Sequence, residues 1–300
     1  MRVTPGRGGE AERRAQSASE AFEEATGARL MGIVNATPDS FSDGGRYLDP
    51  AAAIAHGLEL AQEGAAIIDV GGESTRPGAQ PVSESEECAR VLPVIEGLVA
   101  AGVPAQLSID TCKAGVARRA LAAGATFVND VSALRADPQM AACVAESGAE
   151  CCLMHMRGRP RTMQRDPRYG DVVAEVKRFL AERLELALAA GIAERRIVLD
   201  PGIGFGKTVA HNLALLARLD ELATLGRPLL IGVSRKSFIG AIGAAASGSE
   251  EPLAVDRRLA GTIAANVLAY ERGARIFRVH DIAPARDALA LAAATLAGDE

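Results

Sequence analysis

The sequence alternates eight times between a short apolar run and a longer segment with helical spacing, and this alternation limits the folds open to the chain. The apolar runs are 30–34, 66–70, 106–109, 127–130, 151–154, 197–199, 229–232 and 276–279. The segments expected to be helical are 50–63, 83–101, 113–123, 138–146, 171–190, 212–222, 256–272 and 283–296. Glycine, the usual residue at a helix stop, lies at the end of seven of them, at positions 64, 102, 124, 148, 191, 226 and 273. Strands that alternate with helices pair in parallel, so the pattern predicts a parallel sheet covered by helices.

Eight strand–helix units without a change of composition between them predict a single closed (β/α)8 barrel, a TIM barrel, over residues 29–297. A doubly wound open sheet is the alternative, but such sheets usually have fewer strands and often carry a dinucleotide-binding fingerprint. Residues 1–28 offer almost nothing to bury. We therefore expect a disordered N-terminal tail, with a short helix at 18–25 as the alternative.

Composition excludes several classes of protein. The 33 basic and 38 acidic residues give a net charge of −5, which argues against a nucleic-acid partner. No apolar run approaches the ~20 residues of a membrane helix, and the N-terminus lacks the apolar centre of a secretion signal. The five cysteines form no C-x-x-C pair. We therefore expect a cytoplasmic protein with reduced thiols that neither binds nucleic acid nor enters a membrane.

Polar side chains follow all eight expected strands, at the end of the barrel where enzymes of this fold build their active sites. They are Asn35, Asp69, Asp110, Asn129 with Asp130, His155, Asp200, Ser234 with Arg235 and Lys236, and Arg278 with His280 and Asp281. Each one alone is equally well explained as a helix cap, a turn former or a bracing salt bridge. Those explanations do not account for the concentration of polar residues at one end of eight strands. That concentration predicts a catalytic centre there.

The glycine-rich segment GIGFGKT, residues 202–208, looks at first like a nucleotide-binding loop. A P-loop needs glycine where this chain has Pro201, and the dinucleotide fingerprint needs glycine where it has Lys207. ATP and NAD are therefore poor candidates. The glycines are better explained by close approach of the backbone to a flat ligand.

The residue types at the strand ends suggest the chemistry of the ligand. Asp and Asn side chains can pair with the N–H groups of a fused-ring aminopyrimidinone. Lys236, Arg278 and His280 suit a phosphate or pyrophosphate group. Asn35 is a neutral oxygen ligand, and a Mg²⁺ ion bound mainly through substrate phosphates needs only one or two protein ligands. The pattern predicts an anionic substrate with a flat ring, and Mg²⁺ as the cofactor.

Eight segments, in this order along the chain, resemble the motifs of the dihydropteroate synthase family. They are NATPDSFSDGG (35–45), DVGGESTRPGA (69–79), SIDT (108–111), NDVSAL (129–134), LMHMRGRPRTMQ (153–164), DPGIGFGKT (200–208), GVSRKSFIG (232–240) and RVHD (278–281). The resemblance spans roughly residues 29–297, and the first two motifs together are close to diagnostic. It implies a folate-pathway transferase on a (β/α)8 barrel, which joins 6-hydroxymethyl-7,8-dihydropterin pyrophosphate to p-aminobenzoate and releases pyrophosphate and 7,8-dihydropteroate.

The resemblance also implies roles for individual residues. The pterin pocket would consist of Asp110, Asn129, Met154, Asp200, Gly204 and Lys236. The surroundings of p-aminobenzoate would be Thr75, Arg76, Pro77, Phe205 and Ser234. Pyrophosphate would lie at Asn35, Arg76, Arg278 and His280, and Asn35 would also ligate Mg²⁺. In this family the C–O bond to pyrophosphate is thought to break before the amine attacks, so catalysis would fall to the residues that face the resulting charges: Asp110, Lys236, Arg278 and His280.

The segments outside the strand ends carry weaker expectations. Loops 35–47 and 71–82 are rich in Gly, Ser, Pro and Asp and are expected to close as lids over p-aminobenzoate. Members of the family commonly form homodimers, and the Ala- and Leu-rich helices 256–272 and 283–296 offer an apolar face, although packing on the barrel explains them equally well. The segment 243–252 is longer than the resemblance leads us to expect, and it touches no motif.

Two other functions remain open. A pterin-binding methyltransferase domain shares the barrel and the Asp/Asn pocket, but it needs neither the DSFSDGG loop nor the SRK and RVHD motifs. A non-catalytic paralogue would be signalled by the loss of Asn35, Asp110 or Lys236, all of which are present. Mg²⁺-dependent release of pyrophosphate separates the synthase from both.

Overall fold

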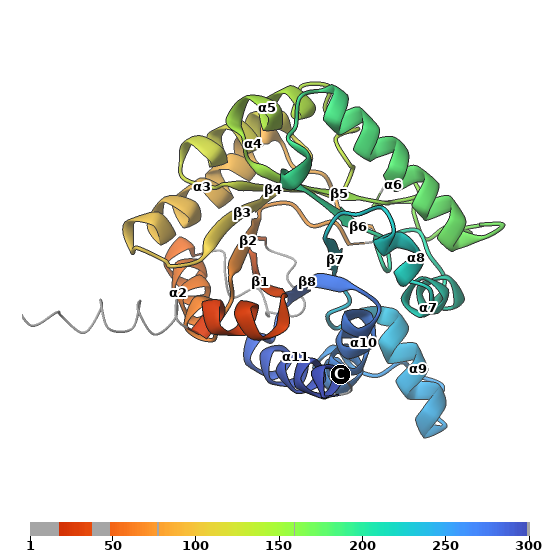
Figure 1. Ribbon diagram of the computed structural model, residues 1–300. Coiled ribbons are helices and arrows are strands. Elements are labelled where there is room, and N and C mark those ends of the chain that lie inside the picture. Colours follow the sequence, from red (N-terminus) through yellow and green to blue (C-terminus); the bar gives the residue numbers. More distant parts are fainter. Residues whose placement is uncertain (1–17, 38–48, 77, 159, 299–300) are drawn as a thin grey trace, which may run out of the picture.

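A barrel of eight parallel strands forms the centre of the computed structural model, which describes residues 18–37, 49–76, 78–158 and 160–298 (Figure 1). The strands close in the order of the sequence, with β8 paired to β1. They are β1 (Arg29–Asn35), β2 (Ile67–Gly71), β3 (Gln106–Asp110), β4 (Phe127–Asp130), β5 (Glu150–Met154), β6 (Ile197–Asp200), β7 (Leu229–Ile231) and β8 (Ala274–Val279). The closed barrel confirms the predicted fold class and excludes the open doubly wound sheet.

Helices surround the barrel on the outside (Figure 1). They are α2 (Pro50–Gln62), α3 (Glu84–Ala100), α4 (Ala114–Ala122), α5 (Met140–Ser147), α6 (Val172–Ala189), α7 (Val209–Ala217), α8 (Asp220–Ala223), α9 (Ser237–Ser247), α10 (Leu259–Glu271) and α11 (Ile282–Ala297). All seven glycines expected at helix ends have φ between 65° and 117°. Side chains are strained in that region, so the glycine stops confirm the predicted helix ends.

The inside of the barrel changes from apolar to polar along the strands. Seven buried side chains from seven strands form one apolar cluster: Met31, Ile67, Phe127, Cys152, Val198, Leu230 and Ile276. Side chains alternate along a strand, so the residue two positions further on faces the same way. At those positions stand Ile33, Asp69, Asn129, Met154, Asp200, Gly232 and Arg278. The polar level therefore lies at the carboxyl ends of the strands, where the active site was predicted.

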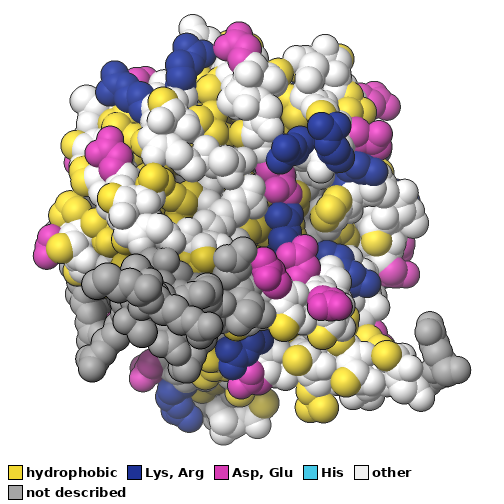
Figure 2. Space-filling view, turned by 60° about the vertical axis from the view of Figure 1, so that its left-hand side comes forward, with side chains coloured by type: hydrophobic (Ala, Val, Ile, Leu, Met, Phe, Trp, Pro, Cys, Tyr) yellow, Lys and Arg dark blue, Asp and Glu magenta, His cyan; other side chains and the backbone are white. Residues whose placement is uncertain are grey.

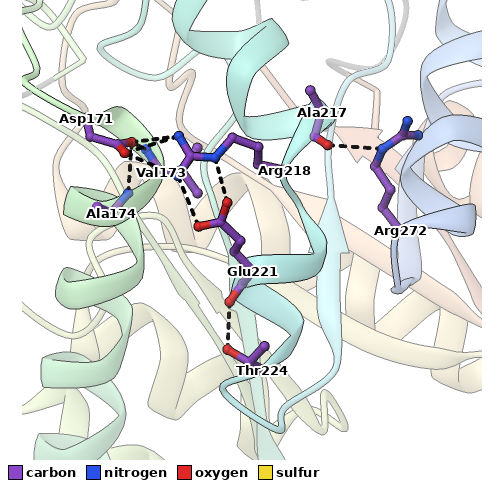
Figure 3. Close-up of polar contacts among 8 residues, drawn as sticks. All are labelled: Asp171, Val173, Ala174, Ala217, Arg218, Glu221, Thr224 and Arg272. Carbon is purple, nitrogen blue, oxygen red and sulfur yellow. Dashed lines mark hydrogen bonds and ion pairs between the residues drawn. The ribbon is translucent and has the colours of Figure 1, made fainter.

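The expected helix at 212–222 is instead two helices, α7 and α8, which are separated at Arg218. Arg218 leaves the helical conformation at φ −119° and ψ 33°. Its guanidinium donates to both carboxylate oxygens of Asp171, the N-cap of α6, and to the carboxylate of Glu221 in α8 (Figure 3). These ion pairs connect the interruption between α7 and α8 to the neighbouring helix α6.

Helix α9 was not predicted. Its sequence, SFIGAIGAAAS, contains two glycines and no polar face, so it carries little helical signal of its own. Tertiary packing accounts for it: a Cβ at Gly243 would lie 2.2 Å from Leu253, so only glycine lets the helix pack this closely. The expected helix at 256–272 also begins differently, as a 3₁₀ turn (Val255–Arg258) that leads into α10.

Residues 18–28, the part of the expected N-terminal tail that the structure describes, are ordered. Residues 18–26 are helical, as the alternative allowed, and Phe22 is buried in the main core. The hydroxyl of Tyr270 donates to the backbone oxygen of Thr26 at 2.7 Å. The packed region therefore begins before the expected boundary at residue 29, because an aromatic side chain in the segment finds a place in the core. Residues 1–17 lie outside the part of the chain that is described.

Among the described residues, no helix combines the length and the apolar character needed to cross a bilayer. All five cysteines are free thiols, as expected. The face shown in Figure 2 carries acidic and basic side chains intermixed with hydrophobic ones, so neither sign of charge dominates it.

Candidate active site

A cavity of about 490 Å³ opens at the carboxyl ends of the strands. Thirteen residues that the sequence assigned to the site line it: Asn35, Thr75, Arg76, Asp110, Asn129, Met154, Asp200, Gly204, Phe205, Ser234, Lys236, Arg278 and His280. Pro77, the remaining predicted residue, and most of the predicted lid at 35–47 lie outside the described residues. The structure thus brings together in one cavity every described residue to which a site role was assigned. Four other polar strand-end residues, Asp69, Asp130, His155 and Asp281, do not line it.

A buried cluster of carboxylates and one arginine forms the floor beside β2, β3 and β8. Asp69 is fully buried and accepts hydrogen bonds from Ser108 Oγ at 2.6 Å and Asn129 Nδ2 at 2.9 Å. Arg278 bridges two carboxylates, donating from Nε to Asp69 at 2.7 Å and from Nη2 to Asp110 at 2.9 Å. Burial raises the pKa of Asp110 to about 7, although Arg278 opposes the shift. Asp110 is therefore poised between its neutral and ionised forms near neutral pH.

Asp200 and Lys236 face the cavity from β6 and from the start of α9. Asp200 accepts a hydrogen bond from the backbone N–H of Gly202 at 2.6 Å, and burial raises its pKa. The ammonium of Lys236 donates to the backbone oxygen of Ile203 and lies 4.6 Å from the centre of the Phe205 ring. Burial lowers the pKa of Lys236 to about 8. The pair offers one acceptor and one donor on the same wall.

The glycine-rich segment turns sharply behind this wall, and its lysine points inward. Lys207 is buried, and its ammonium contacts His155 Nδ1 at 2.9 Å and the backbone oxygens of Gly202 and Phe205 at 2.9 and 3.1 Å. Burial and Lys207 lower the pKa of His155 to about 2, so its imidazole is neutral and can accept this bond. Lys207 therefore braces the turn and is not presented to a phosphate, in line with the rejected P-loop.

Gly202→Ala is expected to lower the free energy of unfolding by at least ~2 kcal/mol. Gly202 has φ 66°, and a Cβ there would lie 1.9 Å from the backbone oxygen of His155. Gly226→Ala is the matched control, since its φ is 72° but nothing lies within 4 Å of the added Cβ. The control substitution should lower the free energy of unfolding by only about 1 kcal/mol. Urea unfolding measures both variants, and equal losses would contradict the close contact.

Ser234 and Arg235, in the loop after β7, contact His280 and Asp281, which follow β8. Ser234 Oγ lies 2.8 Å from His280 Nδ1, and burial together with Arg278 lowers the pKa of His280 to about 3. A neutral imidazole can donate a hydrogen bond to an anion but adds no positive charge. Arg235 adopts φ 55° and donates from Nε and Nη2 to the carboxylate of Asp281 at 3.0 and 2.5 Å. Arg235 is thus the bracing salt bridge that its sequence context allowed.

The comparisons with known proteins agree with this geometry. The sequence profile of the pterin binding enzyme family matches residues 31–280. The dihydropteroate synthase of Escherichia coli (strain K12) is 46% identical over 271 residues, which cover 90% of this chain and 93% of the relative. The chain belongs to the dihydropteroate synthase family of pterin-binding enzymes. The dihydropteroate synthase of Mycobacterium leprae is 48% identical over 272 residues, covering 89% of this chain and 93% of the relative.

Solved structures of dihydropteroate synthases share the barrel. One from Yersinia pestis, in a sulfonamide drug complex, superposes with a TM-score of 0.85 at 43% identity and covers 90% of this chain and 94% of its own. One from Xanthomonas albilineans with 4-aminobenzoic acid superposes with a TM-score of 0.81 at 51% identity. The match covers 90% of this chain and 93% of that one. Another from that organism, with 7,8-dihydropteroate, superposes with a TM-score of 0.78 at 48% identity. The match covers 90% of this chain and 94% of that one.

A magnesium ion of the kind predicted for dihydropteroate synthases is compatible with the described donors. The described residues contain no group of three or more His, Cys, Asp or Glu side chains placed to hold a metal. Asn35, at the end of β1, does line the cavity. A Mg²⁺ ion held mainly by substrate phosphates needs only one or two protein oxygens, and the Asn35 amide fits that requirement.

Sequence reasoning missed further residues of the cavity. They are Ile33, Thr37, Glu73, Ser74, Val131, Met163, Gln164, Gly232, Ser237, Val255 and Arg258, together with Arg235, which was noted only as a brace. Asp69 and Ser108 lie beneath the cavity floor and fix it through Asn129 and Arg278. Asp69, already named among the polar strand-end residues, stands two positions beyond the inward-facing Ile67 and so faces the interior as well.

Proposed function

We propose that the protein condenses 6-hydroxymethyl-7,8-dihydropterin pyrophosphate with p-aminobenzoate, forming 7,8-dihydropteroate and releasing pyrophosphate. As a member of the dihydropteroate synthase family it is a transferase. Relatives of known structure contain 4-aminobenzoic acid and 7,8-dihydropteroate, a substrate and the product of this reaction. The observation that carries the proposal is that residues from all eight motifs line one cavity of about 490 Å³.

The pterin would lie across the wall formed by Met154 and Gly204. Asp200, whose carboxylate faces the cavity, would accept from the ring N–H and the exocyclic NH₂ in a bidentate arrangement. Lys236 would donate to the ring carbonyl. Asp110 and Asn129 complete the polar surface from β3 and β4. This placement is supported by the burial of the carboxylates, since buried acceptors discriminate strongly for a ligand that supplies N–H donors.

p-Aminobenzoate would lie between the Phe205 ring and the loop after β2. Thr75 and Arg76 line the cavity from that loop, and Ser234 lines it from the end of β7. Pro77 completes the proposed set but lies outside the described residues. Arg76 would pair with the benzoate carboxylate or with the pyrophosphate, because a guanidinium binds both bidentately.

The reaction separates charge, and the cavity offers groups for both signs. When the C–O bond breaks, its electron pair leaves with pyrophosphate and a cation forms on the pterin methylene carbon. The nitrogen of p-aminobenzoate then bonds to that carbon and loses a proton. Asp110 would stabilise the cation, while Asn35, Arg76, Arg278 and His280 would bind the leaving anion. Mg²⁺ held at Asn35 would supply further positive charge to the pyrophosphate.

We also propose that the protein forms a homodimer through α10 and α11. Leu268 of α10 is 47% exposed, and Leu291 and Leu296 of α11 are 71% and 44% exposed. The two helices lie side by side (Figure 1), so these exposed apolar side chains stand on neighbouring helices. Light scattering should give twice the chain mass of 31.1 kDa, and Leu291→Glu should return it to 31.1 kDa. A wild-type mass of one chain would refute the dimer.

Product identification tests the proposed reaction. The purified protein is incubated with the pterin pyrophosphate, p-aminobenzoate and Mg²⁺, and the products are identified by mass spectrometry. Formation of 7,8-dihydropteroate and pyrophosphate in equal amounts supports the proposal. Tight binding of the pterin without product would contradict it and favour a binding-only paralogue, and transfer of a methyl group would favour the methyltransferase.

A further inference from the structure

Lys113 is a charged residue that the proposed reaction does not use. It is the N-cap of α4, three residues beyond Asp110 at the end of β3. Its ammonium contacts two carboxylates, those of Glu73 and Glu87, and the distance to Glu87 Oε2 is 2.5 Å. Glu73 lies in the loop after β2, and Glu87 lies in α3. One lysine therefore joins three elements at the rim of the barrel.

The burial of this cluster makes the lysine necessary. Glu87 is fully buried, and its Oε1 has no hydrogen-bond partner among the described residues. The side chains of Lys113 and Glu73 are each 26% exposed. Burial alone would lower the pKa of Lys113, but hydrogen bonds to Glu73 and Glu87 raise it above its ordinary value. Lys113 therefore stays charged at neutral pH and is the cation that both carboxylates share.

The loop after β2 is held at two consecutive residues, Gly72 and Glu73, where it reaches the edge of the cavity. Arg90 Nη1 of α3 donates to the backbone oxygen of Gly72 at 2.8 Å, and Lys113 pairs with the next residue, Glu73. Gly72 is also packed tightly, since a Cβ there would lie 2.7 Å from Val91. Glu73 itself and the following residues, 74–76, line the cavity. The two cations thus set the point from which these cavity residues extend.

We propose that Lys113 is a positioning residue for p-aminobenzoate, which acts by holding Glu73 and thereby fixing residues 74–76 against the cavity. This inference rests on the proposed function. Lys113 does not line the cavity itself. The pterin side should be insensitive to it, because Asp110 is fixed independently by Arg278 and by its pairing with Asn129 of β4.

Steady-state kinetics of Lys113→Met tests the inference. The KM for p-aminobenzoate should rise about tenfold, while the KM for the pterin pyrophosphate stays within about twofold. Lys113→Arg should restore the wild-type value, because a guanidinium can pair with both carboxylates. A purely structural role would lower the fraction of active protein, and so kcat, without raising one KM selectively. Lys177→Met, which removes a lysine from α6, is the control and should change neither KM.

Two more variants separate positioning from folding. Lys113→Met leaves the buried Glu87 without a cation, so Lys113→Met/Glu87→Gln removes that penalty while Glu73 still lacks its partner. Glu73→Ala breaks the same contact and keeps the Lys113–Glu87 pair. Both should retain the selective rise in KM. Unchanged KM for p-aminobenzoate in these variants, or equal rises in both KM values, would overturn the inference. A wild-type protein without turnover would instead refute the proposed function.

Discussion

Replacing Arg278 with methionine is expected to lower kcat/KM at least ~100-fold and the free energy of unfolding by about 3 kcal/mol. Arg278 is the only described side chain that bridges Asp69 and Asp110, and Asp69 is fully buried. Without the guanidinium, two buried carboxylates face each other without a cation between them. The proposed pyrophosphate site loses one of its two arginines in the same step. Kinetics and urea unfolding measure the two losses separately.

The loss of stability in this variant should grow with pH. Arg278 is the main group that opposes the rise in the pKa of Asp110, so its removal raises that pKa further above about 7. A carboxyl group whose pKa is higher in the folded than in the unfolded chain destabilises the fold increasingly as pH rises between the two values. The loss should therefore be smaller at about pH 5 than at about pH 8. Arg275→Met is the control, since Arg275 lies on the same strand but donates to the backbone oxygens of Tyr270 and Ala274. A loss independent of pH, or as large in the control, would contradict the bridging role.

Asp110→Asn is expected to lower kcat about 100- to 1000-fold without loss of stability at neutral pH. The amide keeps the size of the side chain and can still accept from Arg278, but it cannot stabilise a cation on the pterin. Burial raises the pKa of Asp110 to about 7, so ionisation of this carboxyl lowers the free energy of unfolding of the wild type. The amide of Asp110→Asn does not ionise and avoids this loss. Unfolding free energy and kcat should therefore change independently.

The same variant should alter the pH dependence of the reaction. If the ionised form of Asp110 is the active one, kcat/KM of the wild type rises with pH through about 7, and this limb is absent from Asp110→Asn. The control is Asp166→Asn, which removes an exposed carboxylate that pairs with Arg168. A wild-type pH profile in Asp110→Asn, or an undiminished kcat, would remove Asp110 from the mechanism.

The sequence was sufficient for the barrel because each strand–helix unit carries its own local signal. Apolar runs gave the strands, and glycines with positive φ gave the helix ends. Local signal was missing for α9, whose Ala- and Gly-rich sequence becomes a helix through packing against Leu253. It was also missing for the break between α7 and α8 at Arg218, whose guanidinium pairs with Asp171, the N-cap of another helix.

Thirteen of the residues that line the cavity could be predicted, but not how they pair with one another. The rule that barrel enzymes act at the strand ends placed Asp110, Asp200 and Lys236 in one site. No periodicity links Arg278 to Asp69, which lies 209 residues earlier on a strand that is not its neighbour. The Lys113–Glu73 contact likewise joins two loops through folding alone. Pairing of this kind follows from barrel closure, which a single sequence does not encode locally.

The proposed reaction requires that one cavity binds both substrates and separates charge between them. The most direct test is release of pyrophosphate from the pterin pyrophosphate, measured with and without p-aminobenzoate and Mg²⁺. We expect pyrophosphate release to require both additions and to fall sharply in Asp110→Asn and in Lys236→Ala. Release that proceeds equally without p-aminobenzoate, or that is unchanged in both variants, would contradict this expectation.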